Sequence, residues 1–496
     1  MSENHVIGSD RGQKLLLPDT LDEYVNEDSD ARFIDAFVDR LDLHGFGFKH
    51  SAPKDGAGRP SYSPYDLLKL YIYGYLNQVR SSRKLERECR RNLEAMWLIR
   101  KLTPDFKTIA NFRKDNVDCI KKVFREFVSI CKGLDLIGGE LVGIDGTKLK
   151  AVNSKNRNFN EGKLKYRLER LERHTLEYLR EIEENDRKEP DDHDEAQKQR
   201  QAFVVERAKK EVEKLETKKN EYDGLLDLLH RTGQTEISLT DPESRLMKNN
   251  EKLEVCYNVQ SIVDSKHHLV PEYEVTNEAT DREQLSLMAK SAKEALDVER
   301  LDVTADMGYF SFQRIKECID DGITPYVSEL PLDSRSRNPN GTQDPDFYKG
   351  KFHYDKERDS YTCPAGNELT LTRWNTRKNG MRLKVYRTPA CADCRFRSMC
   401  TRDQTNGRAV LRWEHEDVIE ELRAMLKTPE GAAIVKKRRE LVEHPFGTIK
   451  RAFNQGYLLL KGLRKVRGEV GFTMLAYNMR RAINILGTKR LIDSLG

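Results

Sequence analysis

Two short apolar runs, each followed by an aspartate, constrain the fold of this 496-residue chain more than any other feature. Residues 141–144 precede Asp145, and residues 301–305 precede Asp306. Apolar runs of this length between polar residues are typical of buried strands. An aspartate at the end of a buried strand is held rigidly at the edge of a sheet. The sequence therefore predicts an α/β core that presents two carboxylates.

A third acid, Glu443, stands in a segment with helical spacing. Arg439 lies four residues before it and Lys450 seven after, so the three fall on one face of a helix. Three converging carboxylates would form an all-oxygen site for Mg²⁺. Two metals about 3.5–4 Å apart can activate an attacking oxygen and stabilise a leaving oxygen in phosphoryl transfer. Taken alone, each acid could equally be a solvated surface carboxylate.

The segments around the acids carry longer patterns: GIDGTKLKA around Asp145, ADMGYFS around Asp306 and RELVEHPFGTIKR around Glu443. The chain also contains GRPSYSPYDLLKLYIYGYLNQVRSSRKLERECRRN, LTDPESRLMK, YNVQSIVDSKHHLV and EVTNEATDREQL. Together these motifs resemble DDE transposases of bacterial insertion sequences, over nearly the whole chain. The third segment resembles the Arg-Glu-Lys part of the family's Tyr-Arg-Glu-Lys signature, with Lys436 at the place of the Tyr.

The resemblance implies an RNase H-like catalytic core and an enzyme that cleaves DNA and transfers strands in cut-and-paste transposition. It implies that Asp145, Asp306 and Glu443 hold two Mg²⁺ (or Mn²⁺) ions, while Arg439 and Lys450 position the scissile or flanking phosphate. The implied partners are the terminal inverted repeats of the element and target DNA, bound by a homodimer or higher homo-oligomer. Relatives with the full signature form a DNA hairpin before integration, a step that the Tyr departure leaves open here.

Two other classes of protein remain open. One is a catalytically silent, DNA-binding relative that acts as a regulator, although a pure binder has no need of three carboxylates. The other is a zinc-stabilised coiled-coil assembly protein. Against it stands the segment 436–467, which holds ten basic residues and two acidic ones. The DNA flanking the gene separates these classes, because inverted repeats bracketed by a target duplication indicate a mobile element.

Four of the nine cysteines lie close together in the sequence: Cys363, Cys391, Cys394 and Cys400. Two cysteines with two residues between them can clamp one tetrahedral Zn²⁺, and the other two complete a set of four thiolates. Such a Zn²⁺ would be structural, because four protein ligands leave no position for water. Reduced thiols without a ligand and an iron–sulfur cluster are the alternatives. The other five cysteines stand in apolar patterns and are expected in the core.

The same cysteine-containing segment holds Trp374 and Trp413. In hairpin-forming relatives, an insertion at this place carries a Trp that stacks on a flipped base, which is a physically sound contact. The match here is one of location and not of motif. A position in the core or facing a sheet is therefore the expectation for both tryptophans.

Charge points to nucleic acid through its distribution and not its total. The net charge is only +5, but residues 80–101 hold eight basic residues against three acidic ones. Such a stretch supplies phosphate contacts, or is simply a solvated helix face. No apolar run of 18 residues is present and the N-terminus is polar, so a cytoplasmic, nucleoid-associated protein without a membrane span is expected. Nine cysteines in that compartment argue against a disulfide framework.

Hydrophobic periodicity divides the rest of the chain. Several short helices, one of them over 82–101, suit a helix-turn-helix-like domain or a plain helical bundle. Over 164–226, apolar residues recur at alternating intervals of four and three residues, which predicts a helical hairpin with a coiled-coil seam. Such a hairpin could serve as a spacer or as a dimerisation or DNA-bridging element. The expected parts are a helical DNA-binding domain (1–135), a catalytic core (136–160 and 235–330), the helical hairpin (161–234), a Cys-rich insertion (331–425) and a C-terminal helical part of the core (426–496).

Overall fold

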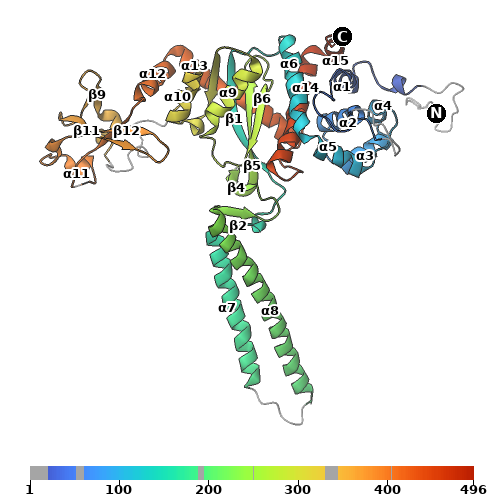
Figure 1. Ribbon diagram of the computed structural model, residues 1–496, viewed down its shortest axis with the longest axis horizontal. Coiled ribbons are helices and arrows are strands. Elements are labelled where there is room, and N and C mark those ends of the chain that lie inside the picture. Colours follow the sequence, from blue (N-terminus) through green and yellow to red (C-terminus); the bar gives the residue numbers. More distant parts are fainter. Residues whose placement is uncertain are drawn as a thin grey trace, which may run out of the picture.

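The computed structural model describes residues 20–51, 61–187, 195–249, 251–329, 344–403 and 405–495. The tip of the expected helical hairpin and the start of the expected Cys-rich insertion lie outside the described residues. A central sheet with its helices separates a group of N-terminal helices from a second, smaller sheet, and two long helices project from the centre (Figure 1).

The N-terminal region is helical, as expected. Its helices begin at residues that can cap them: the Ser63 hydroxyl accepts the N–H of Tyr65, and Asp105 accepts those of Lys107 and Thr108. The single basic helix expected over 82–101 is instead two helices, because the Asn92 side chain accepts the N–H of Ala95 and starts a new one. The helices are α1 (Asp30–Asp39), α2 (Pro64–Leu76), α3 (Ser82–Arg91), α4 (Leu93–Leu98), α5 (Phe106–Asp115) and α6 (Ile120–Gly133).

The central sheet is mixed, which confirms the α/β expectation. Its middle strand β1 (Leu141–Lys150) pairs antiparallel with β5 (Lys252–Asp264) and parallel with β7 (Leu301–Ala305). Beyond β7, β8 (Ile323–Val327) pairs in parallel. The other edge of β5 pairs with β4 (Arg245–Asn249) along its first half and with β6 (Glu272–Thr276) along its second.

Two helices reach β1 from opposite faces. A Cβ on Gly143 would lie 2.7 Å from Val442 Cγ1 of α13, so this glycine allows the helix to pack closely. A Cβ on Gly146, three residues later and therefore on the other face, would lie 2.8 Å from Asp281, just before α9. The helices that follow the central strands in the sequence are α9 (Gln284–Leu296), α10 (Phe312–Asp320), α12 (Glu416–Leu426), α13 (Pro429–Gly447), α14 (Leu463–Leu486) and α15 (Thr488–Asp493).

Helix α14 joins the N-terminal helices to the sheet in one hydrophobic core. The Phe472 ring stacks on Tyr71 and Tyr75 of α2 at 5.3 and 5.1 Å between centroids. On the sheet side, a Cβ on Gly471 would lie 2.5 Å from the Tyr273 hydroxyl of β6. The helix is buried along most of its length, and it lies between the sheet and α2 in Figure 1. The N-terminal region therefore does not have a core of its own.

The two projecting helices are α7 (Glu161–Asp186) and α8 (Glu195–Thr232), which run antiparallel (Figure 1). A short ribbon of β2 (Asn158–Asn160) and β3 (Glu236–Ser238) connects them to the sheet. Pairs such as Lys219 Nζ with Glu172 Oε1, at 2.9 Å, join the helices. Within the described residues, no helix is both long and apolar enough to cross a membrane.

The Cys-rich segment builds a second, antiparallel sheet in the order β13-β12-β11-β10-β9. A small separate core of Phe352, Tyr361, Leu369, Tyr386 and Val410 holds it together. Its elements are β9 (His353–Asp355), β10 (Ser360–Thr362), β11 (Glu368–Thr376), β12 (Arg382–Arg387), α11 (Arg397–Cys400) and β13 (Val410–Trp413). Short turns elsewhere are the 3₁₀ segments Leu21–Tyr24, Val117–Cys119, Lys155–Arg157, Met307–Tyr309, Pro345–Phe347, Lys349–Lys351 and Pro389–Cys391, and the π-helical segment Thr448–Ala452.

Candidate active site

Asp145 and Asp306 lie side by side on neighbouring strands. Strands β1 and β7 are parallel, with Gly143 opposite Thr304. This pairing ends at Gly143 and Thr304, and Asp145 and Asp306 each stand two residues further along, Asp145 on the face that Gly143 presents to α13. Neighbouring strands are about 4.8 Å apart, so the two carboxylates are neighbours. The Asp306 carboxylate also accepts the N–H of Gly308 at 2.8 Å, which fixes its orientation at the end of β7.

The two carboxylates repel each other. Burial and, to a smaller extent, the negative charge of Asp306 raise the pKa of Asp145 to about 6. The Gly146 N–H and the charge of Arg438 act in the opposite direction. The fold thus holds two like charges together in a half-buried place, which is the situation that a divalent cation relieves. Carboxylate oxygens are also the donors that Mg²⁺ prefers, so this pair fits a Mg²⁺ ion.

Glu443 is close to these acids in the fold but does not touch them. It follows directly after Leu441 and Val442, which pack on Gly143 of β1. Its own side chain is exposed. Across the described ranges, no three His, Cys, Asp or Glu side chains come together closely enough to hold a metal ion. The structure therefore brings two of the three predicted acids together and places the helix of the third beside them.

The cations around the acids differ in part from the expected pair. Lys450 is half-buried; burial lowers its pKa, and the charge of Asp145 opposes this effect, so the expected proximity to the acids is present. Arg439 is exposed, whereas Arg438 is half-buried and its charge acts on Asp145. Arg438 stands four residues before Val442, on the side of α13 that faces the sheet. The helical face predicted from Glu443 contains Arg439 and not Arg438, so the sequence alone did not predict this residue.

Lys450 also lies outside the regular part of this helix. The segment Thr448–Ala452 is a π-helical turn that follows α13. Such turns are uncommon and occur frequently at functional sites, because they rotate the following side chains relative to an α-helix. The single helical face expected for Arg439, Glu443 and Lys450 is therefore interrupted before Lys450.

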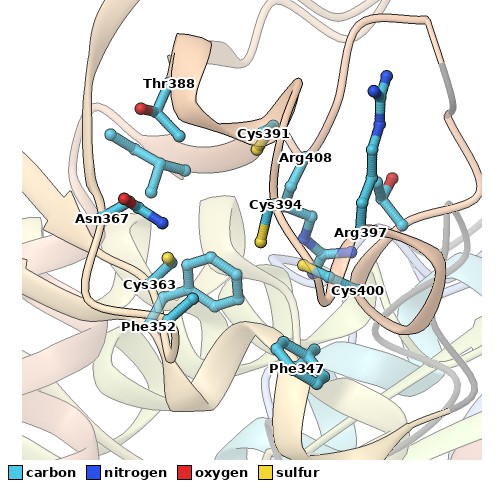
Figure 2. Close-up of a pocket in the computed structure, with 13 residues that line it drawn as sticks. Phe347, Phe352, Cys363, Asn367, Thr388, Cys391, Cys394, Arg397, Cys400 and Arg408 are labelled. Atoms are coloured by element: carbon cyan, nitrogen blue, oxygen red, sulfur yellow. The ribbon is translucent and has the colours of Figure 1, made fainter.

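The four clustered cysteines come together around one small pocket. Figure 2 shows the sulfurs of Cys363, Cys391, Cys394 and Cys400 pointing toward a common space. Burial, and to a smaller extent the other three cysteines, raise the pKa of Cys400 to about 11, and the charge of Arg408 opposes this. The set of donors suits Zn²⁺, although, as stated, no three of them lie at metal-binding positions. The other five cysteines are buried, as expected for core residues.

The two tryptophans have opposite environments. Trp413 is buried and packs edge-on against Phe312 at 5.6 Å, as expected for a core residue. Trp374 is 44% exposed on β11, with the guanidinium of Arg382 4.6 Å from its ring. Strand β10 pairs only with the first residues of β11, so the far end of the β11–β12 hairpin has no strand on that side. Trp374 is therefore not in the core, and its ring lies over side chains of the neighbouring strand β12, which agrees with the sheet-facing alternative.

Two family models match parts of the chain. A model described as a transposase domain (DUF772) matches residues 19–115, and a model described as a transposase DDE domain matches residues 362–483. The second range includes Glu443 and Lys450, whereas Asp145 and Asp306 lie outside both. No curated protein matches the chain.

Among solved structures, the chain is similar to a piggyBac transposase synaptic complex with hairpin DNA, determined by cryo-EM. The sequence identity is 11% and the TM-score 0.32, over 95% of this chain and 80% of that chain. A likeness of this size carries no argument about function. The two family models carry it instead, and together they support a DDE transposase of insertion-sequence type.

Proposed function

We propose that this transposase binds the terminal inverted repeats of its own element and performs metal-dependent cleavage and strand transfer of DNA. The observation that carries the proposal is the parallel pairing of β1 with β7, which ends two residues before Asp145 and Asp306, together with the effect of the Asp306 charge on Asp145. A silent binding protein has no need to hold two mutually repelling carboxylates in a half-buried place. We further propose that the core is RNase H-like. The order of strand with Asp145, strands, helix, strand with Asp306, helix, strand and helix with Glu443 supports this.

Asp145, Asp306 and Glu443 would hold the metal ions. Two Mg²⁺ ions bound there would supply activation of the attacking oxygen and stabilisation of the leaving oxygen. The protein's own part is to fix the two strand-borne carboxylates and to offer Glu443 from the neighbouring helix. Lys450 and Arg438 lie where they can bind the non-bridging oxygens of a phosphodiester next to the acids. Arg439 is exposed and can reach a flanking phosphate.

DNA contact outside the active site is proposed for helix α3. Its side chains Arg83, Lys84, Arg87, Arg90 and Arg91 are exposed, while Leu85 and Cys89 anchor it in the core. A row of exposed cations on an anchored helix supplies phosphate contacts and a salt-dependent affinity. We propose that the active form is a homodimer or higher assembly. Whether the α7–α8 pair serves it as a spacer or as a contact is decided by deleting that pair.

A structural Zn²⁺ in the four-cysteine pocket is a separate proposal. The four thiols converge on one space, and Gly407 lets its loop come within contact of Cys391: a Cβ there would lie 2.5 Å from the Cys391 Cβ. Four thiolates around one ion would link the 3₁₀ turn at Cys391, helix α11 and the loop at Cys363. The ion would stabilise this small sheet and take no part in cleavage.

The experiment that tests the proposed function is cleavage of a labelled DNA fragment that carries the flanking end of the gene. Wild-type protein would be compared with Asp145→Asn and Glu443→Ala, each with Mg²⁺ and with EDTA. We expect metal-dependent cutting at the end by the wild type, and end binding without cutting by both variants. Binding without cutting by the wild type favours the silent regulator. Neither binding nor cutting favours the assembly protein.

A further inference from the structure

A buried polar network lies behind the two aspartates. Its members, which we call the Asp281 network, are Lys148, Asn258, Gln260, Asp281 and Tyr309. They come from β1, from β5, from the loop before α9 and from the turn after Asp306. Asn258 and Gln260 are fully buried and Tyr309 is nearly so. None of these residues belongs to the acidic triad or to its cations.

Asp281 is the centre of the network. Its Oδ1 accepts from Asn258 Nδ2 and Gln260 Nε2, both at 2.7 Å, and from Lys148 Nζ at 3.0 Å. Its Oδ2 accepts from Lys148 at 3.1 Å. Gln260 is held at both ends, because its Oε1 accepts the Tyr309 hydroxyl at 2.5 Å. A carboxylate with this many donors has one orientation, and so do the side chains that donate to it.

The network touches the chain next to Asp145 and again three residues after Asp306. On one side is Gly146, which follows Asp145. A Cβ on Gly146 would lie 2.4 Å from Gln260 Nε2 and 2.8 Å from Asp281 Oδ1. Only glycine leaves space for the network against this strand. On the other side is Tyr309, in the 3₁₀ turn whose first residue follows Asp306.

We propose that Asp281 is a positioning residue, which acts through Gln260 to set the spacing between the Asp145 and Asp306 carboxylates. The inference rests on the proposed function. The network packs on the backbone of Gly146 and binds the turn after Asp306, so both carboxylates are braced from the opposite face of the sheet. Two carboxylates that share a cation must keep a narrow separation, and partners behind metal ligands commonly hold it.

Removing the charge of Asp281 should loosen this brace without removing a metal ligand. In Asp281→Asn, one acceptor oxygen is replaced by a donor that faces the donors of Asn258, Gln260 and Lys148. We expect a roughly 10–100-fold higher concentration of Mn²⁺ for half-maximal effect, as for other residues behind metal ligands. Tyr309→Phe removes one hydroxyl only and should shift the Mn²⁺ requirement in the same direction by a smaller factor.

The measurement is the unfolding temperature of DNA-free full-length protein during a Mn²⁺ titration, followed by cleavage at each Mn²⁺ concentration. Bound metal raises the unfolding temperature by mass action, so the titration reports affinity without catalysis. Binding of the DNA end in EDTA should stay within about twofold of the wild type, because the network is buried away from the basic helix.

Asp264→Asn is the matched control. Asp264 lies on the same strand β5, is fully buried and accepts three N–H groups, from Gly138, Gly139 and Lys266. Its loss should lower the unfolding temperature and leave the Mn²⁺ requirement unchanged. Folded Asp281→Asn and Tyr309→Phe proteins with wild-type Mn²⁺ requirements would overturn the inference alone. The proposed function, and the inference with it, would be overturned by either of two results. One is that Mn²⁺ does not raise the unfolding temperature of the wild type, and the other is that Mn²⁺ raises that of Asp145→Asn equally.

Discussion

Arg80 and Glu469 form a buried ion pair between the N-terminal helices and α14. The Arg80 Nη1 lies 3.5 Å from Glu469 Oε1, and the two side chains are 7% and 1% exposed. Arg80 also donates to the carbonyl of Tyr457, and Glu469 accepts the N–H groups of Leu459 and Leu460. These contacts hold the segment that follows Lys450. One buried set of contacts therefore joins the N-terminal helices, α14 and the segment after Lys450.

Two arginines of the same basic stretch should differ in what their loss affects: protein stability for Arg80 and DNA affinity for Arg87. Arg80→Gln leaves the buried Glu469 with less compensation and should lower the free energy of unfolding by up to about 3–5 kcal/mol. Arg87→Gln, on the exposed side of α3, should leave unfolding unchanged but weaken DNA binding and reduce its salt dependence. Denaturant unfolding and gel-shift titrations at several salt concentrations measure both. Equal DNA affinity of Arg87→Gln and wild type would remove α3 from the proposed interface.

Asp145→Asn should stabilise the metal-free protein at neutral pH. The pKa of Asp145 is about 6 in the folded protein against an ordinary value of 3.8. Its contribution to stability is thus present below pH 3.8 and is lost as pH rises through about 6. Above that pH, removing the charge should add up to about 3 kcal/mol to the free energy of unfolding. Unfolding in EDTA between pH 4 and 8 tests this, and the gain should vanish when Mg²⁺ stabilises the wild type.

Arg438 and Arg439 can be separated by their effects on cleavage. Arg438 is half-buried and its charge acts on Asp145, so Arg438→Gln should slow metal-dependent cleavage by about tenfold or more. Arg439 is exposed, and Arg439→Gln should have the smaller effect on the rate and the larger one on DNA affinity. Single-turnover cleavage at saturating protein separates the two quantities. The reverse order of rates would restore the assignment that the family signature suggests.

The strand-borne acids could be predicted from sequence because their signal is local. An apolar run before Asp145 and another before Asp306 specify buried strands, and a parallel pairing of the two brings the acids together. The role of Arg438 could not be predicted in this way, because the phase of α13 depends on which residues pack on Gly143. Arg80 was counted among DNA-binding cations for a similar reason: its partner Glu469 stands near the other end of the chain.

The four-cysteine pocket predicts a metal-dependent stability of the small sheet alone. Purified protein should contain about one Zn²⁺ per chain, and a chelator should lower the unfolding temperature. Cys391→Ser should abolish Zn²⁺ binding, whereas Cys131→Ser, at a buried position of helix α6, should keep it. Gly407→Ala should also reduce Zn²⁺ content, because its Cβ would meet Cys391. Elemental analysis of the wild type that finds no zinc would leave four reduced thiols.

The two tryptophans predict a last pair of opposite outcomes. Trp374 is exposed among cations, with Arg382 and Lys384 at 4.6 and 5.6 Å from its ring, an arrangement that suits stacking on a nucleic-acid base. Trp374→Ala should weaken binding of single-stranded or distorted DNA ends by about 1–3 kcal/mol and leave unfolding unchanged. Trp413→Ala removes a buried ring beside Phe312 and should cost about 3–5 kcal/mol of stability. Fluorescence quenching measures the affinity of Trp374→Ala for fully paired and for distorted DNA ends. If Trp374 has no role in DNA binding, both affinities will equal those of the wild type.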